Sequence, residues 1–191
     1  MRFLEAAAVL LTLASVVFQI YENIWSWPTT IAGVALYAVL FRQERLYADM
    51  GLQAVYIAIA VYGWYEWLHG GEGRGQRKVS NAPAKVQIAA YVIGGFTAVL
   101  LGFFLRRTTN AALPFLDSTL TSYSLVAQWM LTKKYLENWL VWIAVDVVYV
   151  GMFIFKQLYM TSGLYVVFLF LCLRGWTEWR RSREVIEPAS A

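Results

Sequence analysis

The stretch YLENWLVWIAVDVVY runs from Tyr135 to Tyr149, and Asp146 is the one acid in the apolar run that follows Asn138. Tyr135, Trp139, Trp142, Asp146 and Tyr149 recur at i, i+4, i+7, i+11 and i+14, the spacing of one helix face. The surrounding apolar run is too long for a soluble core helix, which predicts a membrane span with Asp146 near its middle. A carboxylate there costs about 2.5–3.5 kcal/mol on insertion scales unless it faces a polar cavity or a partner.

A carboxylate on a stripe of π-faces suits a cavity for a flat, cationic solute. The alternative is that Asp146 pairs with a neighbouring helix and that the aromatic side chains only pack. Trp139, Trp142 and Asp146 are the strongest candidates for contact with a solute, because they share one face.

The composition predicts a polytopic, all-α membrane protein. The 191 residues are 60% hydrophobic and 15% charged, whereas a soluble domain has about 25% charged residues. The net charge of +4 is modest, and no basic patch indicates a nucleic-acid partner. Cys172 is the one cysteine and His69 lacks a second ligand at metal spacing, so we expect no disulfide, metal or cofactor. The chain shows no nucleophile–base pair, so we do not expect an enzyme.

Seven segments are predicted to span the membrane, at about residues 3–24, 27–41, 46–68, 86–105, 115–131, 136–155 and 158–176. A glycine-rich hydrophilic loop, 70–81, follows the third. Seven spans put the termini on opposite sides of the membrane. Of the 16 Lys and Arg residues, those on the N-terminal side are Arg2, Arg42, Arg45, Arg106, Arg107 and Lys156. The larger remainder predicts a cytoplasmic C-terminus.

The chain also repeats itself. Residues 27–67 align without a gap with residues 139–179, so that Trp27 meets Trp139 and Gly63 meets Gly175. The first span aligns with the fifth at an offset of 109, which pairs Gln19 with Gln128 and implies a three-residue insertion in the following loop. Asp146 corresponds to Val34, so one half alone carries the carboxylate.

Spans one to three thus repeat as spans five to seven, a 3+1+3 arrangement of two parallel triple-helix repeats. Such repeats are typical of transporters that hold the solute at the repeat interface. We expect one integral membrane domain over residues 1–191. Its parts are the first triplet (1–69), the loop and connector helix (70–112), the second triplet (113–180) and a polar tail (181–191).

Amide and aromatic side chains extend the expected site. An amide inside a bilayer needs a hydrogen-bond partner, which the hydroxyls or carboxamide of a solute, or a neighbouring helix, can provide. The expected solute-binding set is Gln53, Tyr56, Trp64, Gln128, Asn138, Trp139, Trp142, Asp146 and Tyr149.

Three segments resemble the signature of the PnuC family of vitamin transporters. They are LYADMGLQAVYIAIAVYGWYEW at 46–67, LPFLDS at 113–118 and KKYLENWLVW at 133–142. The resemblance implies a fold similar to the SWEET sugar transporters and a homotrimer in the bacterial inner membrane, in contact with its lipids. It also implies facilitated diffusion of nicotinamide riboside, with a cytoplasmic kinase that phosphorylates the solute. Family cavity positions match Gln53, Trp64, Gln128, Asn138, Trp139, Trp142 and the position of Asp146.

Asp146 departs from the amide that the resemblance implies for nicotinamide riboside carriers. Thiamine, which related transporters carry, therefore stays open beside nicotinamide riboside, since both solutes have a permanent cation on a flat ring. We expect nicotinamide riboside first and thiamine second. A membrane scaffold protein is the alternative of another class, and it would need exposed motifs or soluble extensions.

Overall fold

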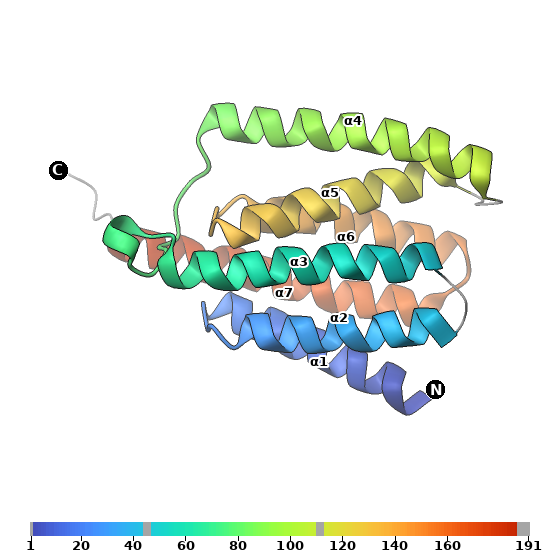
Figure 1. The fold of residues 1–191 in the computed structure, drawn as a ribbon, viewed down its shortest axis with the longest axis horizontal. Helices are drawn as coiled ribbons and strands as arrows, with labels where there is room; N and C mark the ends of the chain where they lie inside the picture. Colours follow the sequence, from blue (N-terminus) through green and yellow to red (C-terminus); the bar gives the residue numbers. More distant parts are fainter. Residues whose placement is uncertain (1, 44–46, 110–112, 187–191) are drawn as a thin grey trace. The chain divides into compact units, whose positions relative to one another are not determined.

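The computed structural model describes residues 2–43, 47–109 and 113–186, and these are mainly helical (Figure 1). They form α1 (Arg2–Ile20), α2 (Ser26–Gln43), α3 (Tyr47–His69), the short 3-10 helix η1 (Glu72–Arg74), α4 (Ala84–Thr108), α5 (Pro114–Thr132), α6 (Asn138–Phe155) and α7 (Tyr159–Ile186). The all-α class is confirmed, and a helix occupies each of the seven predicted segments. The expectations for Arg45, for a third span from residue 46, for the connector segment at 110–112 and for the tail at 187–191 lie outside the described residues.

Four of the described helices, α1, α4, α6 and α7, are long and apolar enough to cross a membrane. Helix α4 carries many exposed apolar side chains: Ile88, Val92, Ile93 and Phe96 are 63–65% exposed in this chain. Apolar side chains presented in such number along one helix require a lipid or protein environment. The chain is a multi-pass membrane protein, and spans at α2, α3 and α5 stay a prediction from the sequence.

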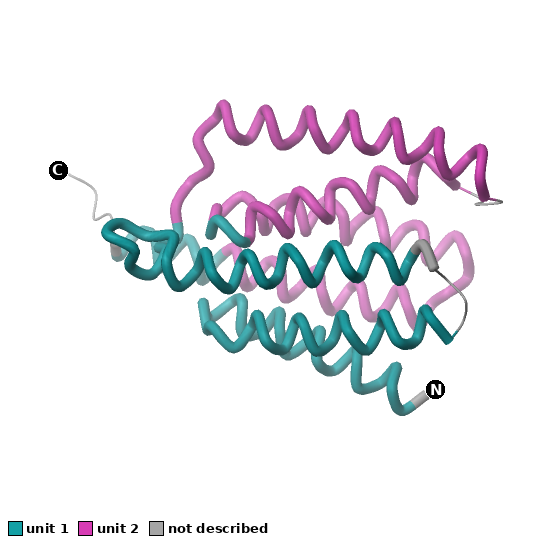
Figure 2. The backbone as a smooth tube through the Cα atoms, viewed as in Figure 1, with its two compact units in different colours: residues 1–79, 132–134, 177–191 teal, residues 80–131, 135–176 magenta. Residues whose placement is uncertain are grey.

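The chain forms two compact units, each of which combines distant segments (Figure 2). Unit 1 comprises residues 1–79, 132–134 and 177–191 and so holds α1, α2, α3 and η1 with the turn after α5 and the end of α7. Unit 2 comprises residues 80–131 and 135–176 and holds α4, nearly all of α5, α6 and the first part of α7.

Two pairs of helix boundaries repeat at an interval of 112 residues. Helix α2 begins at Ser26 and helix α6 begins at Asn138. Helices α1 and α5 also end 112 positions apart, at Ile20 and Thr132. The expected offset of 109 for this pair, with its loop insertion, is therefore wrong.

The turns after α1 and α5 share the same backbone conformation. The Asn23 N–H donates to the Phe18 carbonyl at 2.8 Å, and the Tyr135 N–H donates to the Met130 carbonyl at 3.1 Å. Glu22 and Lys134 both adopt a left-handed conformation, with φ of 54° and 48°. A left-handed non-glycine residue is uncommon, so its presence at the same repeat position in both turns supports the interval of 112.

Two segments differ from the sequence expectation. Tyr135 lies in the turn before α6, which starts at Asn138, so it does not share the helix face of Trp139 and Asp146. Helix α7 runs to Ile186, ten residues beyond the expected end of its span. Its polar last turns carry an i,i+4 ion pair between Arg180 and Glu184 at 3.0 Å, a contact that supports an exposed helix.

Small residues allow the helices of unit 2 to pack closely. On α4, Ala90, Gly94, Ala98 and Gly102 are spaced four residues apart and buried. A side chain at Gly94 would come within 3.0 Å of Val126, and one at Gly102 would overlap Phe115, both on α5. Stripes of small residues are typical of helices that approach each other closely in membranes.

Candidate functional site

The carboxylate of Asp146 is held inside unit 2. Its side chain points from α6 and is 3% exposed, and its Oδ2 accepts a hydrogen bond from the Cys172 Sγ of α7 at 3.5 Å. A thiol is a weak donor, so this contact offsets little of the cost of burying a charge. Asp146 therefore keeps acceptor capacity that a cationic solute could use.

Trp139 and Asn138 begin α6 and are fully enclosed, at 1% and 0% exposed. The Trp139 ring covers Gly175 of α7, where an added Cβ would lie 2.6 Å from the ring. The Asn138 Nδ2 donates to the Tyr135 carbonyl at 2.7 Å, while its Oδ1 accepts no hydrogen bond from the described residues. A buried acceptor without a partner costs about 1–3 kcal/mol, so a donor on a bound solute would stabilise it.

Tyr149 lies in an aromatic cluster near the other end of α6. Its ring stacks on Phe153 with centroids 5.8 Å apart and lies 4.6 Å from the ring of Tyr165 on α7. Trp142 is half-buried and, like Tyr149, packs against the apolar core of unit 2. Gln128, on α5, is 7% exposed. Unit 2 thus holds six of the nine expected solute-binding residues.

The other three expected residues lie on α3 in unit 1. Gln53 is half-buried and donates to the Asp49 carbonyl of its own helix at 3.4 Å, a weak contact that a solute could replace. Tyr56 is half-buried and Trp64 is 37% exposed. The aromatic faces on α3 are thus more open than Trp139 in unit 2.

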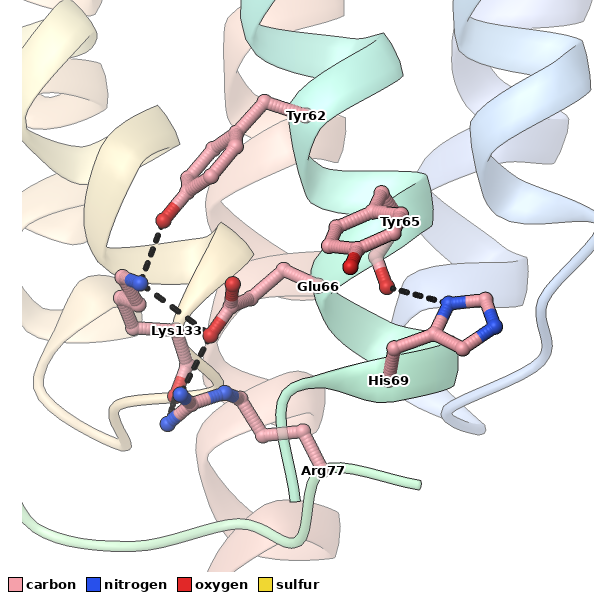
Figure 3. Close-up of polar contacts among 6 residues, drawn as sticks. All are labelled: Tyr62, Tyr65, Glu66, His69, Arg77 and Lys133. Atoms are coloured by element: carbon pink, nitrogen blue, oxygen red, sulfur yellow. Dashed lines mark hydrogen bonds and ion pairs between the residues drawn. The ribbon is translucent and has the colours of Figure 1, made fainter. Parts of the chain in front are cut away.

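Unit 1 contains a cluster of charged groups that was not predicted from the sequence. Glu66 of α3 is 7% exposed and accepts hydrogen bonds from Arg77 and from Lys133, whose Nζ lies 3.1 Å from Oε1 (Figure 3). Lys133 also donates to the Tyr62 hydroxyl. Burial alone would lower the pKa of Lys133, but its hydrogen bonds to Tyr62 and Glu66 outweigh burial and raise that pKa above its ordinary value. One signal was available, since Glu66-Trp67 repeats as Glu178-Trp179.

A second ion pair in unit 1 joins the equivalent turns of the two repeats. The Lys134 Nζ lies 2.7 Å from the Glu22 Oε2 and 4.5 Å from the centroid of the Trp67 ring. The Trp67 ring packs edge-on against Trp27 at 5.2 Å. Lys133 and Lys134 therefore tie the turn after α5 to both α3 and the turn after α1, which explains why residues 132–134 belong to unit 1.

Comparison with known proteins places the chain among membrane transporters. The family model described as "Nicotinamide mononucleotide transporter" matches residues 2–181. The nicotinamide riboside transporter PnuC of Escherichia coli (strain K12) is 27% identical over 207 residues, which cover 95% of this chain and 87% of that protein.

The riboflavin/roseoflavin transporter RibM of Streptomyces davaonensis is 31% identical over 182 residues, which cover 89% of this chain and 83% of that protein. A crystal structure of the vitamin B3 transporter PnuC shares the fold, with a TM-score of 0.71 at 22% identity, and the match covers 94% of this chain and 81% of that one. The chain therefore belongs to the nicotinamide mononucleotide transporter family, the PnuC family that the sequence resembles, and it is a transporter rather than an enzyme.

Proposed function

We propose that this protein carries nicotinamide riboside across the membrane by facilitated diffusion. The observation that carries the proposal is Asp146, a buried carboxylate on the same helix as Trp139, Trp142 and Tyr149. A negative charge among aromatic faces favours a flat cation over a neutral ring of the same size. The nicotinamide riboside transporters among the relatives support the choice of solute.

In this proposal each of the nine expected residues contributes to recognition of the solute. Asp146 neutralises the cationic ring, and Trp139, Trp142, Tyr149, Tyr56 and Trp64 supply stacking surfaces. The amides of Gln53, Gln128 and Asn138 bond the hydroxyls and the carboxamide, and the open Oδ1 of Asn138 supports such a role. Phosphorylated solutes should be excluded, since a phosphate would meet a carboxylate in a medium of low dielectric constant.

Thiamine remains the second candidate, because it also carries a cation on a flat ring and Asp146 would serve it equally well. Riboflavin is a third, favoured by the 31% identity to RibM, but its neutral ring gives Asp146 no partner. A membrane scaffold without transport is the least supported alternative, since every named relative cited above is a transporter.

Titration of the purified protein with a panel of solutes tests the choice. Nicotinamide riboside should bind most tightly, thiamine next, and nicotinamide mononucleotide and riboflavin much more weakly. Binding of the mononucleotide as tight as that of the riboside would contradict the exclusion of phosphate. Tightest binding by riboflavin would overturn the assignment of a cationic solute.

The wider setting is also proposed. All seven helices cross the bacterial inner membrane in the 3+1+3 arrangement with the C-terminus in the cytoplasm, and the protein assembles as a homotrimer. A single acid deep in the membrane does not form a proton relay, so transport is not coupled to protons. The solute is instead retained by a cytoplasmic kinase that phosphorylates it. Liposomes that contain the protein without a kinase should equilibrate the solute. Accumulation driven by a proton or sodium gradient would exclude facilitated diffusion.

A further inference from the structure

An open groove of about 460 Å³ lies in unit 2 between α4 and α5. Its lining includes Lys85, Ala89, Ile93 and Thr97 of α4 and Trp129 of α5. The nine expected solute-binding residues are not among those that line it. The expected solute therefore does not account for this groove.

The groove follows from the way the two helices diverge. Gly102 lies against Phe115 and Gly94 against Val126, and from there α4 and α5 separate toward the start of α4 (Figure 2). From Lys85 to Thr97 the lining rises by twelve helical steps, or about 18 Å at 1.5 Å per residue. The hydrocarbon core of a bilayer is about 30 Å thick, so the groove extends from one end of the span to about its middle.

The residues that line the groove suit a ligand that has an apolar chain and a charged end. Apart from Lys85, the side chains and glycine that line the groove are uncharged, and most of them are apolar. Lys85 is exposed in the first turn of α4, where a membrane span meets the lipid headgroups. Ile93 is 63% exposed, so the groove opens toward the same surroundings as the outer face of α4.

We propose that this groove binds an anionic phospholipid from the leaflet in which α4 begins. The phosphate lies at the ammonium group of Lys85, and one acyl chain lies along Ala89 and Ile93 toward Thr97. The length of the groove matches an acyl chain of a single leaflet, and the position of its one charge matches that of a headgroup. The lipid would fill the space that the diverging helices leave open.

The experiment uses the full-length protein in vesicles that contain phosphatidylglycerol with a photoactivatable acyl chain. Crosslinks mapped by mass spectrometry should fall on the residues of α4 and α5 that line the groove. Lys85→Ala should weaken binding of phosphatidylglycerol about fivefold, the effect of one lysine at an anionic lipid surface. Ala89→Phe should block the chain path and remove the groove crosslinks.

Matched variants separate this site from general contact with lipid. Lys156→Ala removes another exposed lysine of unit 2, and Val92→Phe enlarges an exposed residue of α4 outside the groove lining; neither should change binding. Melting temperatures establish that each variant folds. Phosphatidylcholine that binds as tightly as phosphatidylglycerol, with no effect of Lys85→Ala, would overturn the proposal. So would displacement of the lipid by nicotinamide riboside, or a changed oligomer with unchanged crosslinks after Ala89→Phe.

Discussion

The contact between Trp27 and Gly63 in unit 1 and the contact between Trp139 and Gly175 in unit 2 are equivalent. In each, the glycine lies 36 positions after the tryptophan, the ring is almost fully buried, and an added Cβ would overlap it. The residues near these contacts differ. Val34 and Ala60 stand in unit 1 where Asp146 and Cys172 stand in unit 2, and only the second pair forms a polar contact.

The shared residues stabilise the packing of the helices, and we expect the residues that differ to recognise the solute. The contact between a tryptophan and a glycine is kept in both units, because it brings α2 against α3 in unit 1 and α6 against α7 in unit 2. The first repeat also buries an acid, Glu66, but Arg77 and Lys133 neutralise its charge. Asp146 makes no ion pair with the described residues, and a buried acid of that kind is costly for any scaffold, so it indicates a task that the other repeat does not have. The equivalent residues Ser26 and Asn138 show the same division, since both are fully buried but only Asn138 has an amide for a solute.

The largest effect is expected from removing the shared rings. Trp27→Ala and Trp139→Ala should each lower the free energy of unfolding by about 3–5 kcal/mol, because a large buried side chain is lost. Only Trp139→Ala should also weaken solute binding. Melting temperatures and solute titrations in detergent measure the two effects. Trp25→Ala, at a ring 64% exposed, is the control. If Trp27→Ala and Trp139→Ala bind the solute with equal affinity, Trp139 does not belong to the solute site.

The next effect contrasts the equivalent acids Glu66 and Glu178. Glu66→Gln takes the carboxylate from Arg77 and Lys133 and should cost about 1.5–3 kcal/mol. Glu178→Gln should cost at most about 1 kcal/mol, since its ion pair with Arg181 is 3.8 Å long and Arg181 is 74% exposed. Chemical denaturation of both variants tests the contrast. Losses of equal size would show that burial does not distinguish the two positions.

Asp146→Asn tests the polar feature that only one repeat has. It removes the charge but keeps the size, so binding of a cationic solute should weaken about tenfold to a hundredfold. The melting temperature should hold, because a buried amide costs less than a buried acid. Glu72→Gln, at an exposed acid of η1, is the control. Unchanged affinity with a lower melting temperature would mean that Asp146 serves packing through its contact with Cys172.

The smallest effect concerns the ion pair between the equivalent turns. Glu22→Gln, which neutralises the more exposed partner, should cost about 1 kcal/mol, or about 2–4 °C in melting temperature. Lys134→Gln should cost more, because it also removes the contact of a buried lysine with the Trp67 ring, and the double variant completes the cycle. The double-mutant cycle gives the coupling. A coupling of zero would show that the two charges do not hold the turns together.

Much of the fold could be predicted from the sequence, because the apolar runs and the polar segments between them determine where helices end. The expected start of the fourth span at residue 86 lies two residues from the start of α4 at Ala84. The interval of 109 for α1 and α5 misled because a shift of three residues returns nearly to the same helix face. Gln19 and Gln128 can thus match within an apolar pattern while the helix ends do not. The left-handed turn residues Glu22 and Lys134, which fix the register, have no distinctive letter in the sequence.

By itself the sequence determined that the protein crosses a membrane, that its helices repeat, and that Asp146 stands alone on an aromatic stripe. These features depend on residue type and helical period, which are local. Only the tertiary structure decided the partners: Cys172 for Asp146, Gly175 for Trp139 and Glu22 for Lys134. The period gives the face on which a side chain lies but not the residue opposite it, because that depends on how separate helices pack.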